Sequence, residues 1–236
     1  MTGNLVSTLN TTGTATAQPF DEQLAVVGRF AFQPFHGYDW LTHFGVHGTW
    51  VARPADTSGP AAAGASPFSR YTVQFRERPE LRIDGTRLID TGAIDARHAS
   101  ELGLEFAFQK KNFYVESELE RMAVVRAAPG VSNPHFTAFY VEGSWILTGE
   151  ARRYNTASAS FDAPPVDHPF TLHGGGGAWE LAVRYSDVNL NYNAGAVGAA
   201  LTSIVIPGGT TTDGIRGGEQ KICRWASTGT RTLWCG

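Results

Sequence analysis

Apolar and polar residues alternate with a period of two along much of this 236-residue chain. The even positions of one such run hold Phe44, Val46 and Trp50, and the odd positions between them hold His47 and Thr49. Successive side chains of a β-strand point to opposite faces of the sheet, so this pattern predicts strands with one apolar and one polar face. No helical period of comparable clarity appears, and we therefore expect an all-β, antiparallel fold.

The same alternation predicts further strands, which turn residues separate from one another. The predicted strands cover residues 24–33, 43–50, 70–78, 101–109, 113–120, 139–147 and 179–186. Lys110-Lys111-Asn112 predicts a tight turn that joins two of these strands into a hairpin. The predicted loops and turn regions cover residues 56–69, 83–97, 150–176 and 189–218, which are rich in Gly, Ala, Pro, Ser, Asn or Thr or low in apolar residues.

Two all-β architectures fit these strands, a soluble β-sandwich and a membrane β-barrel. No apolar run approaches the about 20 residues of a membrane helix, but barrel strands are only half apolar. Aromatic residues such as Trp40 and Trp145 stand at strand ends, as in the girdles of membrane barrels. The charged strand face of Glu116, Glu118 and Glu120 suits a water-filled lumen. We therefore favour an antiparallel transmembrane β-barrel, with the sandwich as the alternative.

Several other classes of function lack support in the sequence. The formal net charge of -3 argues against a nucleic-acid partner. No nucleophile elbow, phosphate-binding loop or zinc-ligand spacing occurs, so we expect neither an enzyme nor a cofactor. His43 and His47 share a strand face but lie about 13 Å apart along an extended chain, so a shared metal ion is not expected. We interpret both histidines as polar lining.

Arginines are the candidate residues for ion passage. The guanidinium group stays charged and binds phosphate oxygens through two parallel hydrogen bonds, and rings of arginine or lysine select anions. We predict that the anion pathway is lined by Arg70, Arg76, Arg78, Arg82, Arg87, Arg29 and Arg184. For each arginine the alternative is a structural ion pair with a carboxylate across the wall. Inward-facing glutamates such as Glu105 and Glu142 also leave a general, non-selective pore open as an alternative.

Six sequence motifs in a fixed order add a family resemblance. They are GRFAFQPF, RERPELRIDGTRLIDTG, GLEFAFQ, FYVEGSWILTGEARRY, GAWELAVRYS and GGEQ, between about Asp21 and Gln220. Together they resemble the C-terminal half of the phosphate-selective porin O and P family. The resemblance implies a homotrimeric barrel of about sixteen strands in the outer membrane of a Gram-negative bacterium. It also implies passive passage of small anions such as phosphate or polyphosphate along arginines and lysines of the lumen.

Both ends of the chain depart from that family. Residues 1–19 are polar and lack the basic and apolar regions of a signal peptide, so we expect the sequence to begin part-way through a longer gene. If the codons from Arg224 onward are read in a shifted frame, they permit Leu-Gly-Phe-Asn-Trp-Tyr-Pro-Asn-Pro-Leu-Val-Arg, which resembles the closing strand of the family. We therefore hypothesise a porin barrel fragment at residues 1–223 and a frameshifted tail at residues 224–236.

These expectations leave two further alternatives for the polypeptide itself. A soluble β-sandwich binding module would share only the patterning of a porin. A partial barrel would leave unpaired strand edges, which hydrocarbon does not tolerate, so a truncated product without function is the other alternative.

Overall fold

A computed structural model of the chain describes residues 23–55, 71–77, 89–169, 176–193, 215–227 and 229–233. Every regular element within these ranges is a β-strand, as the alternation predicts. In this part of the chain no helix is long and apolar enough to cross a membrane.

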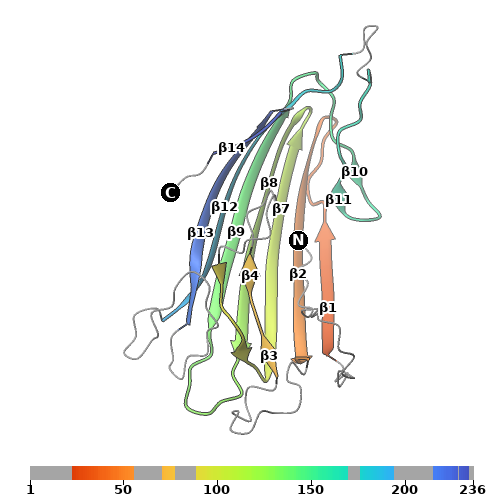
Figure 1. The fold of residues 1–236 in the computed structure, drawn as a ribbon. Helices are drawn as coiled ribbons and strands as arrows, with labels where there is room; N and C mark the ends of the chain where they lie inside the picture. The colour runs from red at the N-terminus through yellow and green to blue at the C-terminus, as the bar shows by residue number, and fades with distance from the viewer. Residues whose placement is uncertain are drawn as a thin grey trace, which may run out of the picture.

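Eight strands form one antiparallel sheet, which is tilted and curved (Figure 1). In order across the sheet they are β1 (Leu24–Phe32), β2 (Trp40–Arg53), β7 (His98–Lys110), β8 (Phe113–Val125), β9 (His135–Ile146), β12 (Glu180–Tyr192), β13 (Ile215–Ser227) and β14 (Gly229–Leu233). Their order in the sheet is their order in the chain, as in an up-and-down barrel wall. Among the described residues β1 and β14 each pair on one side only, so the wall is open.

The remaining strands are two residues long and pair with one another, not with the wall. They are β3 (Thr72–Val73) with β6 (Ile94–Asp95), β4 (Arg76–Glu77) with β5 (Ile89–Asp90), and β10 (Tyr154–Asn155) with β11 (Ser160–Phe161). The predicted wall strand at residues 70–78 is therefore wrong. Its apolar residues Val73 and Phe75 pack against the inner side of the wall instead.

The wall strands also extend beyond their predicted ends. β12 continues to Tyr192, inside the segment predicted as a loop, because backbone pairing with β9 and β13 persists after the apolar alternation stops. β13 was not predicted: it begins at Ile215, inside the predicted loop at residues 189–218, and its backbone runs without interruption across residue 223. The division of the chain at residue 223 therefore stays a prediction about the gene.

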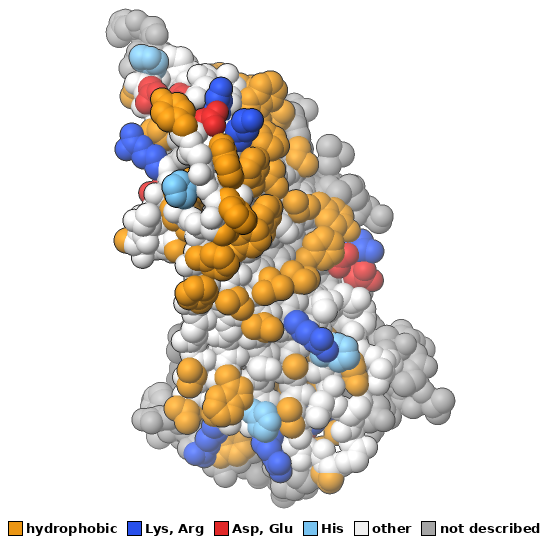
Figure 2. All heavy atoms as spheres, turned by 180° about the vertical axis from the view of Figure 1, so that it is seen from behind, with side chains coloured by type: hydrophobic (Ala, Val, Ile, Leu, Met, Phe, Trp, Pro, Cys, Tyr) orange, Lys and Arg blue, Asp and Glu red, His pale blue; other side chains and the backbone are white. Residues whose placement is uncertain are grey.

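Large apolar side chains cover the outer, convex face of the wall from β1 to β9 (Figure 2). Cross-strand pairing places Phe30, Val46, Leu104, Leu119 and Phe139 in one row across five strands. Each of these side chains is more than a third exposed. Soluble monomers rarely expose an apolar patch larger than a few hundred Å². The same row continues to Asp187 of β12 and Lys221 of β13, which form an ion pair at 3.7 Å. The outer face from β1 to β9 therefore suits hydrocarbon and disfavours the soluble sandwich.

Aromatic side chains mark the edges of this apolar band. Trp40, Phe113 and Trp145 lie in one cross-strand row at the end of the wall where β7 turns into β8. Trp50 lies ten residues further along β2, on the same face. Ten residues of strand span about 34 Å, or about 26 Å of height at a barrel tilt of ~40°. That height matches the apolar band of about 25 Å in outer-membrane barrels.

The inner face near the opposite end carries a hydrophobic core, which we call the inner core. Wall residues Val51, Ala99, Met122, Val124, Phe136 and Leu190 pack there against Val73, Ile89, Ile94 and Ala96. The rings of Phe75 and Phe136 lie 5.4 Å apart between centroids. Burial of such side chains stabilises by about 1.5–3 kcal/mol each, so the segment 71–77 and 89–97 is held inside the curve of the wall.

Candidate ion pathway on the inner wall

The middle of the inner wall carries ionisable side chains on three adjacent strands. In the register, Glu105 of β7 lies opposite Gly45 of β2 and Glu118 of β8. His47 lies opposite Gly103, which in turn lies opposite Glu120. Residues opposite one another in antiparallel strands share a face, so these groups form two neighbouring rows on the concave side.

Glu105 is the centre of the first row. Arg29 donates from Nε to Oε1 at 2.8 Å and from Nη2 to Oε2 at 2.6 Å. These two hydrogen bonds make a bidentate ion pair. His47 Nδ1 lies 2.9 Å from Oε1, and His43 Nε2 lies 3.2 Å from Oε2. Both oxygens of the carboxylate are therefore shared between the arginine and the two histidines.

Two glycines make room for this arrangement. A Cβ atom at Gly45 would lie 2.7 Å from Oε2 of Glu105, and a Cβ at Gly103 would overlap the imidazole of His47. Real Cβ atoms do not approach neighbours this closely, so any larger residue would displace the side chain lying over it. The glycines thus let the Glu105 carboxylate and the His47 ring lie flat across the neighbouring strand.

A hairpin at residues 151–162, which we call the inner hairpin, lies against the same face. Arg29 donates to the carbonyl oxygens of Ser158 and Ala159 at 2.9 Å and 3.0 Å. The Tyr154 hydroxyl lies 2.8 Å from His43 Nδ1, and burial raises the pKa of this tyrosine. Gln109 Nε2 donates to a hairpin carbonyl, that of Arg152, at 2.9 Å. The hairpin is therefore tied to the inner face of the wall by polar contacts.

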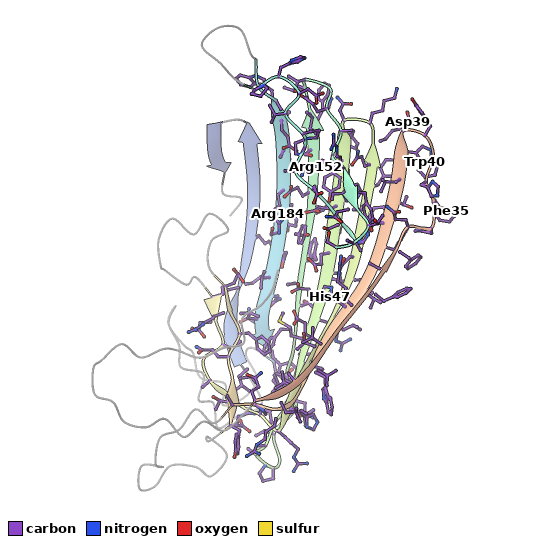
Figure 3. The ribbon with its side chains drawn as sticks, turned by 90° about the vertical axis from the view of Figure 1, so that its right-hand side faces the viewer. Phe35, Asp39, Trp40, His47, Arg152 and Arg184 are labelled. Atoms are coloured by element: carbon purple, nitrogen blue, oxygen red, sulfur yellow. The ribbon has the colours of Figure 1, made fainter. Side chains whose placement is uncertain are left out.

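Two arginines lie near aromatic rings on this side of the wall (Figure 3). Arg184 is 3.4 Å from the Glu142 carboxylate and stacks 3.6 Å above the centroid of Tyr140. Arg152 donates to Glu180 at 2.6 Å, and its guanidinium carbon lies 5.0 Å from the centroid of Tyr114. Such cation–π contacts hold the charge in place beside a carboxylate. Both signs of charge therefore line the wall.

Only some of the arginines predicted to line an anion pathway lie in the described residues. Arg29 and Arg184 lie on the inner face of the wall, each in an ion pair with a glutamate. Arg76 lies on β4, in the segment inside the wall. The others, Arg70, Arg78, Arg82 and Arg87, lie outside the described residues. Arg29, Arg76 and Arg184 come from separate elements, and an arginine-lined pathway stays a prediction.

Sequence reasoning missed the inner hairpin. Arg152 and Tyr154 belong to a segment of low apolarity that predicts only a loop, and strands two residues long are too short for a periodic signal. The motif FYVEGSWILTGEARRY ends at Tyr154, and its last residues could have indicated the hairpin. Arginine and tyrosine next to each other suit a polar contact with the wall. Nothing in the local sequence indicates which strand they contact.

Comparison with known proteins agrees with this architecture. A family model described as phosphate-selective porin O and P matches residues 5–218. The chain belongs to the phosphate-selective porin O and P family. It is also 32% identical, over 170 residues, to an uncharacterized protein of Caulobacter vibrioides. The aligned part makes up 69% of this chain and 33% of that protein, so the chain spans about a third of the length of this relative.

Membership of the porin family agrees with the two faces of the wall. Porins are channels of the outer membrane, and an apolar outer face with a charged inner face is the arrangement that such a channel requires. The strands of the wall are 12–14 residues long from β2 to β13, which exceeds the about 9–11 residues that a tilted spanning strand needs.

Proposed function

We propose that this porin wall belongs to a passive diffusion channel in the outer membrane of a Gram-negative bacterium. The channel passes small hydrophilic ions, including anions such as phosphate or polyphosphate. The contrast between the two faces of the same strands carries this proposal, because Phe139 and Val141 of β9 face outward while Tyr140 and Glu142 face the charged interior. As in the family, we propose a homotrimer surrounded by outer-membrane lipid.

The charges of the described inner wall support weak selectivity. Arg29, Arg152 and Arg184 each lie within 3.4 Å of a glutamate, so their positive charges are partly balanced. Glu101 of β7 and Glu120 of β8 lie on the same face, and no arginine or lysine of the described residues pairs with them. A pore lined by both signs passes both anions and cations, and phosphate is one substrate among several.

Planar-bilayer recording of the purified protein tests this function. In a gradient of potassium chloride we expect ohmic current steps with a reversal potential near zero, because neither ion is strongly favoured. A reversal potential close to that of chloride, together with block by added phosphate, would contradict weak selectivity and support a phosphate-selective pore. If a longer gene product conducts and the 236-residue chain does not, then this chain is one part of the wall and not a working pore.

The connections between strands also support an orientation in the membrane. At one end of the wall the connections 33–39, 111–112 and 228 are short, and 147–179, which contains the inner hairpin, is long; the connections 54–97, 126–134 and 193–214 at the other end are all longer than these three short ones. Outer-membrane barrels have short periplasmic turns and longer extracellular loops. Because three of the four connections at the first end are short, we propose that the turn at residues 111–112 faces the periplasm and that residues 126–134 face the cell exterior. A membrane-impermeant thiol reagent on intact cells should label a cysteine at Ser132 and spare one at Asn112; the reverse result would contradict this orientation.

A further inference from the structure

His47 also lies close to glutamates that take no part in the ion pairs with arginine. One ligand atom from each of His47, Glu101 and Glu120 lies within 4.8 Å of the others. The same separation holds for His47, Glu105 and Glu118. These residues come from β2, β7 and β8, so cross-strand register assembles the group and no sequence spacing could reveal it.

The two nitrogens of His47 have different partners. Nδ1 lies 2.9 Å from Glu105 Oε1, whereas Nε2 faces Glu118 Oε1 at 3.5 Å. A carboxylate only accepts hydrogen bonds, so Glu105 requires the proton of the neutral ring on Nδ1. That tautomer leaves the lone pair on Nε2, which faces Glu118 of β8. Histidines that bind metals commonly donate the other ring N–H to a carboxylate in this way.

Arg29 holds the Glu105 carboxylate in the place where it accepts the hydrogen bond from His47. Arg29 holds both oxygens of this group, which leaves the carboxylate an acceptor for His47 and not a free metal ligand. Gly103 leaves the space that the His47 ring occupies, because any side chain at this position would displace the ring. Among the described residues, no arginine or lysine pairs with Glu101 or Glu120, and Glu118 Oε1 lies 3.5 Å from His47 Nε2. Glu101, Glu118 and Glu120 therefore lie close to the His47 imidazole, and no arginine or lysine of the described residues is paired with them.

We propose that His47 Nε2 and the carboxylates of Glu101 and Glu120 bind a divalent cation of the Zn²⁺ type, with Glu118 within reach as a further ligand. Imidazole nitrogen with carboxylate oxygens is a donor set for zinc and similar borderline metals, whereas Ca²⁺ prefers oxygen ligands alone. The site differs from a metal ion shared by His43 and His47, which the spacing along the strand does not favour, because its other ligands come from neighbouring strands. It does not depend on ion conduction through the wall.

Equilibrium dialysis of Zn²⁺ against the metal-stripped protein in detergent micelles tests this site. We expect saturable binding that His47→Gln and Glu120→Gln each weaken by at least about tenfold. Glu105→Gln should weaken it by about 10–100-fold, as loss of a supporting carboxylate does. The matched control is Glu116→Gln, a glutamate of the same strand face that contacts Tyr114 and Tyr140 instead. This variant should bind Zn²⁺ like the unmodified protein.

Three results would overturn the proposal. They are unchanged Zn²⁺ affinity in His47→Gln and Glu120→Gln, equal affinity for Ca²⁺ and Zn²⁺, or no saturable binding. A measurement on the unmodified protein covers the case in which a variant does not fold. Saturating Zn²⁺ should slow the reaction of His47 with diethylpyrocarbonate, followed by mass spectrometry, while exposed His135 keeps its rate. An unchanged rate at His47 would mean that no metal binds this imidazole.

Discussion

The outer face of β8 carries apolar side chains, and its inner face carries charged ones. Leu119 is 49% exposed in the middle of the apolar outer face, while its neighbour Glu118 lies on the inner face beside His47. A shift of one residue along a strand therefore exchanges hydrocarbon for a charged, polar surface. The effect of a substitution on the stability of this wall should therefore depend more on the face that the side chain occupies than on the residue type.

Two phenylalanines of β9 test the comparison most strongly. Phe136 is 1% exposed in the inner core, and Phe139 is 41% exposed on the outer face. We expect Phe136→Ala to lower the free energy of unfolding by about 3–5 kcal/mol, because it leaves a cavity among packed side chains. Phe139→Ala should cost at most about 2 kcal/mol, because lipid fills the vacated space. Urea titration in lipid vesicles measures both, and equal costs would contradict the assignment of faces.

Arginine substitutions at two depths of the outer face test whether this face lies in the membrane. Leu104 lies in the middle of the apolar band, and Thr137 lies on the same face two residues nearer the Trp50 edge, between Arg121 and Asn189. Leu104→Arg should destabilise the folded protein by about 2–4 kcal/mol, and Thr137→Arg by about 0–1 kcal/mol. The same unfolding titration checks this difference. A soluble sandwich would tolerate Leu104→Arg at this exposed position, so a negligible cost there would support that alternative.

Ion pairs on the inner face should give the smallest effects. Arg29→Ala removes the ion pair with Glu105 and the hydrogen bonds to Ser158 and Ala159. We expect a loss of about 1 kcal/mol and faster proteolysis of the inner hairpin, because Arg29 itself is partly exposed. Lys111→Ala is the control, since its pair with Asp39 is 3.7 Å long and exposed, and should change stability by less than about 0.5 kcal/mol. Unchanged proteolysis in Arg29→Ala would show that the hairpin is held by other contacts.

The sequence predicted the wall far better than its interior. Alternation identified each long strand from β1 to β12 and put Glu116, Glu118 and Glu120 on one face, because a period of two depends only on local geometry. The family motifs predicted the porin relationship that the family match confirms. The segment at residues 71–77 was wrongly assigned to the wall, because its alternation is real but its apolar face packs on the inner core.

The candidate site was predictable only in part. The inward direction of His43, His47 and the glutamates follows from parity, whereas their mutual contacts depend on the register between strands. Register is set by pairing across the sheet, which no single strand encodes. Arg29 illustrates the point, because the sequence predicts an inward arginine but not the glutamate 76 positions away that binds it.

Spin labels at neighbouring positions 118 and 119 test the central claim, that adjacent residues of one strand face water and lipid. Cys223 and Cys235 are first replaced by serine, and a single cysteine is introduced as Glu118→Cys or Leu119→Cys. In lipid vesicles, the label at position 119 should collide more with oxygen, which dissolves in hydrocarbon. The label at position 118 should collide more with a water-soluble nickel complex. The same accessibility at both positions, or the reverse order, would contradict a membrane wall with a charged inner face.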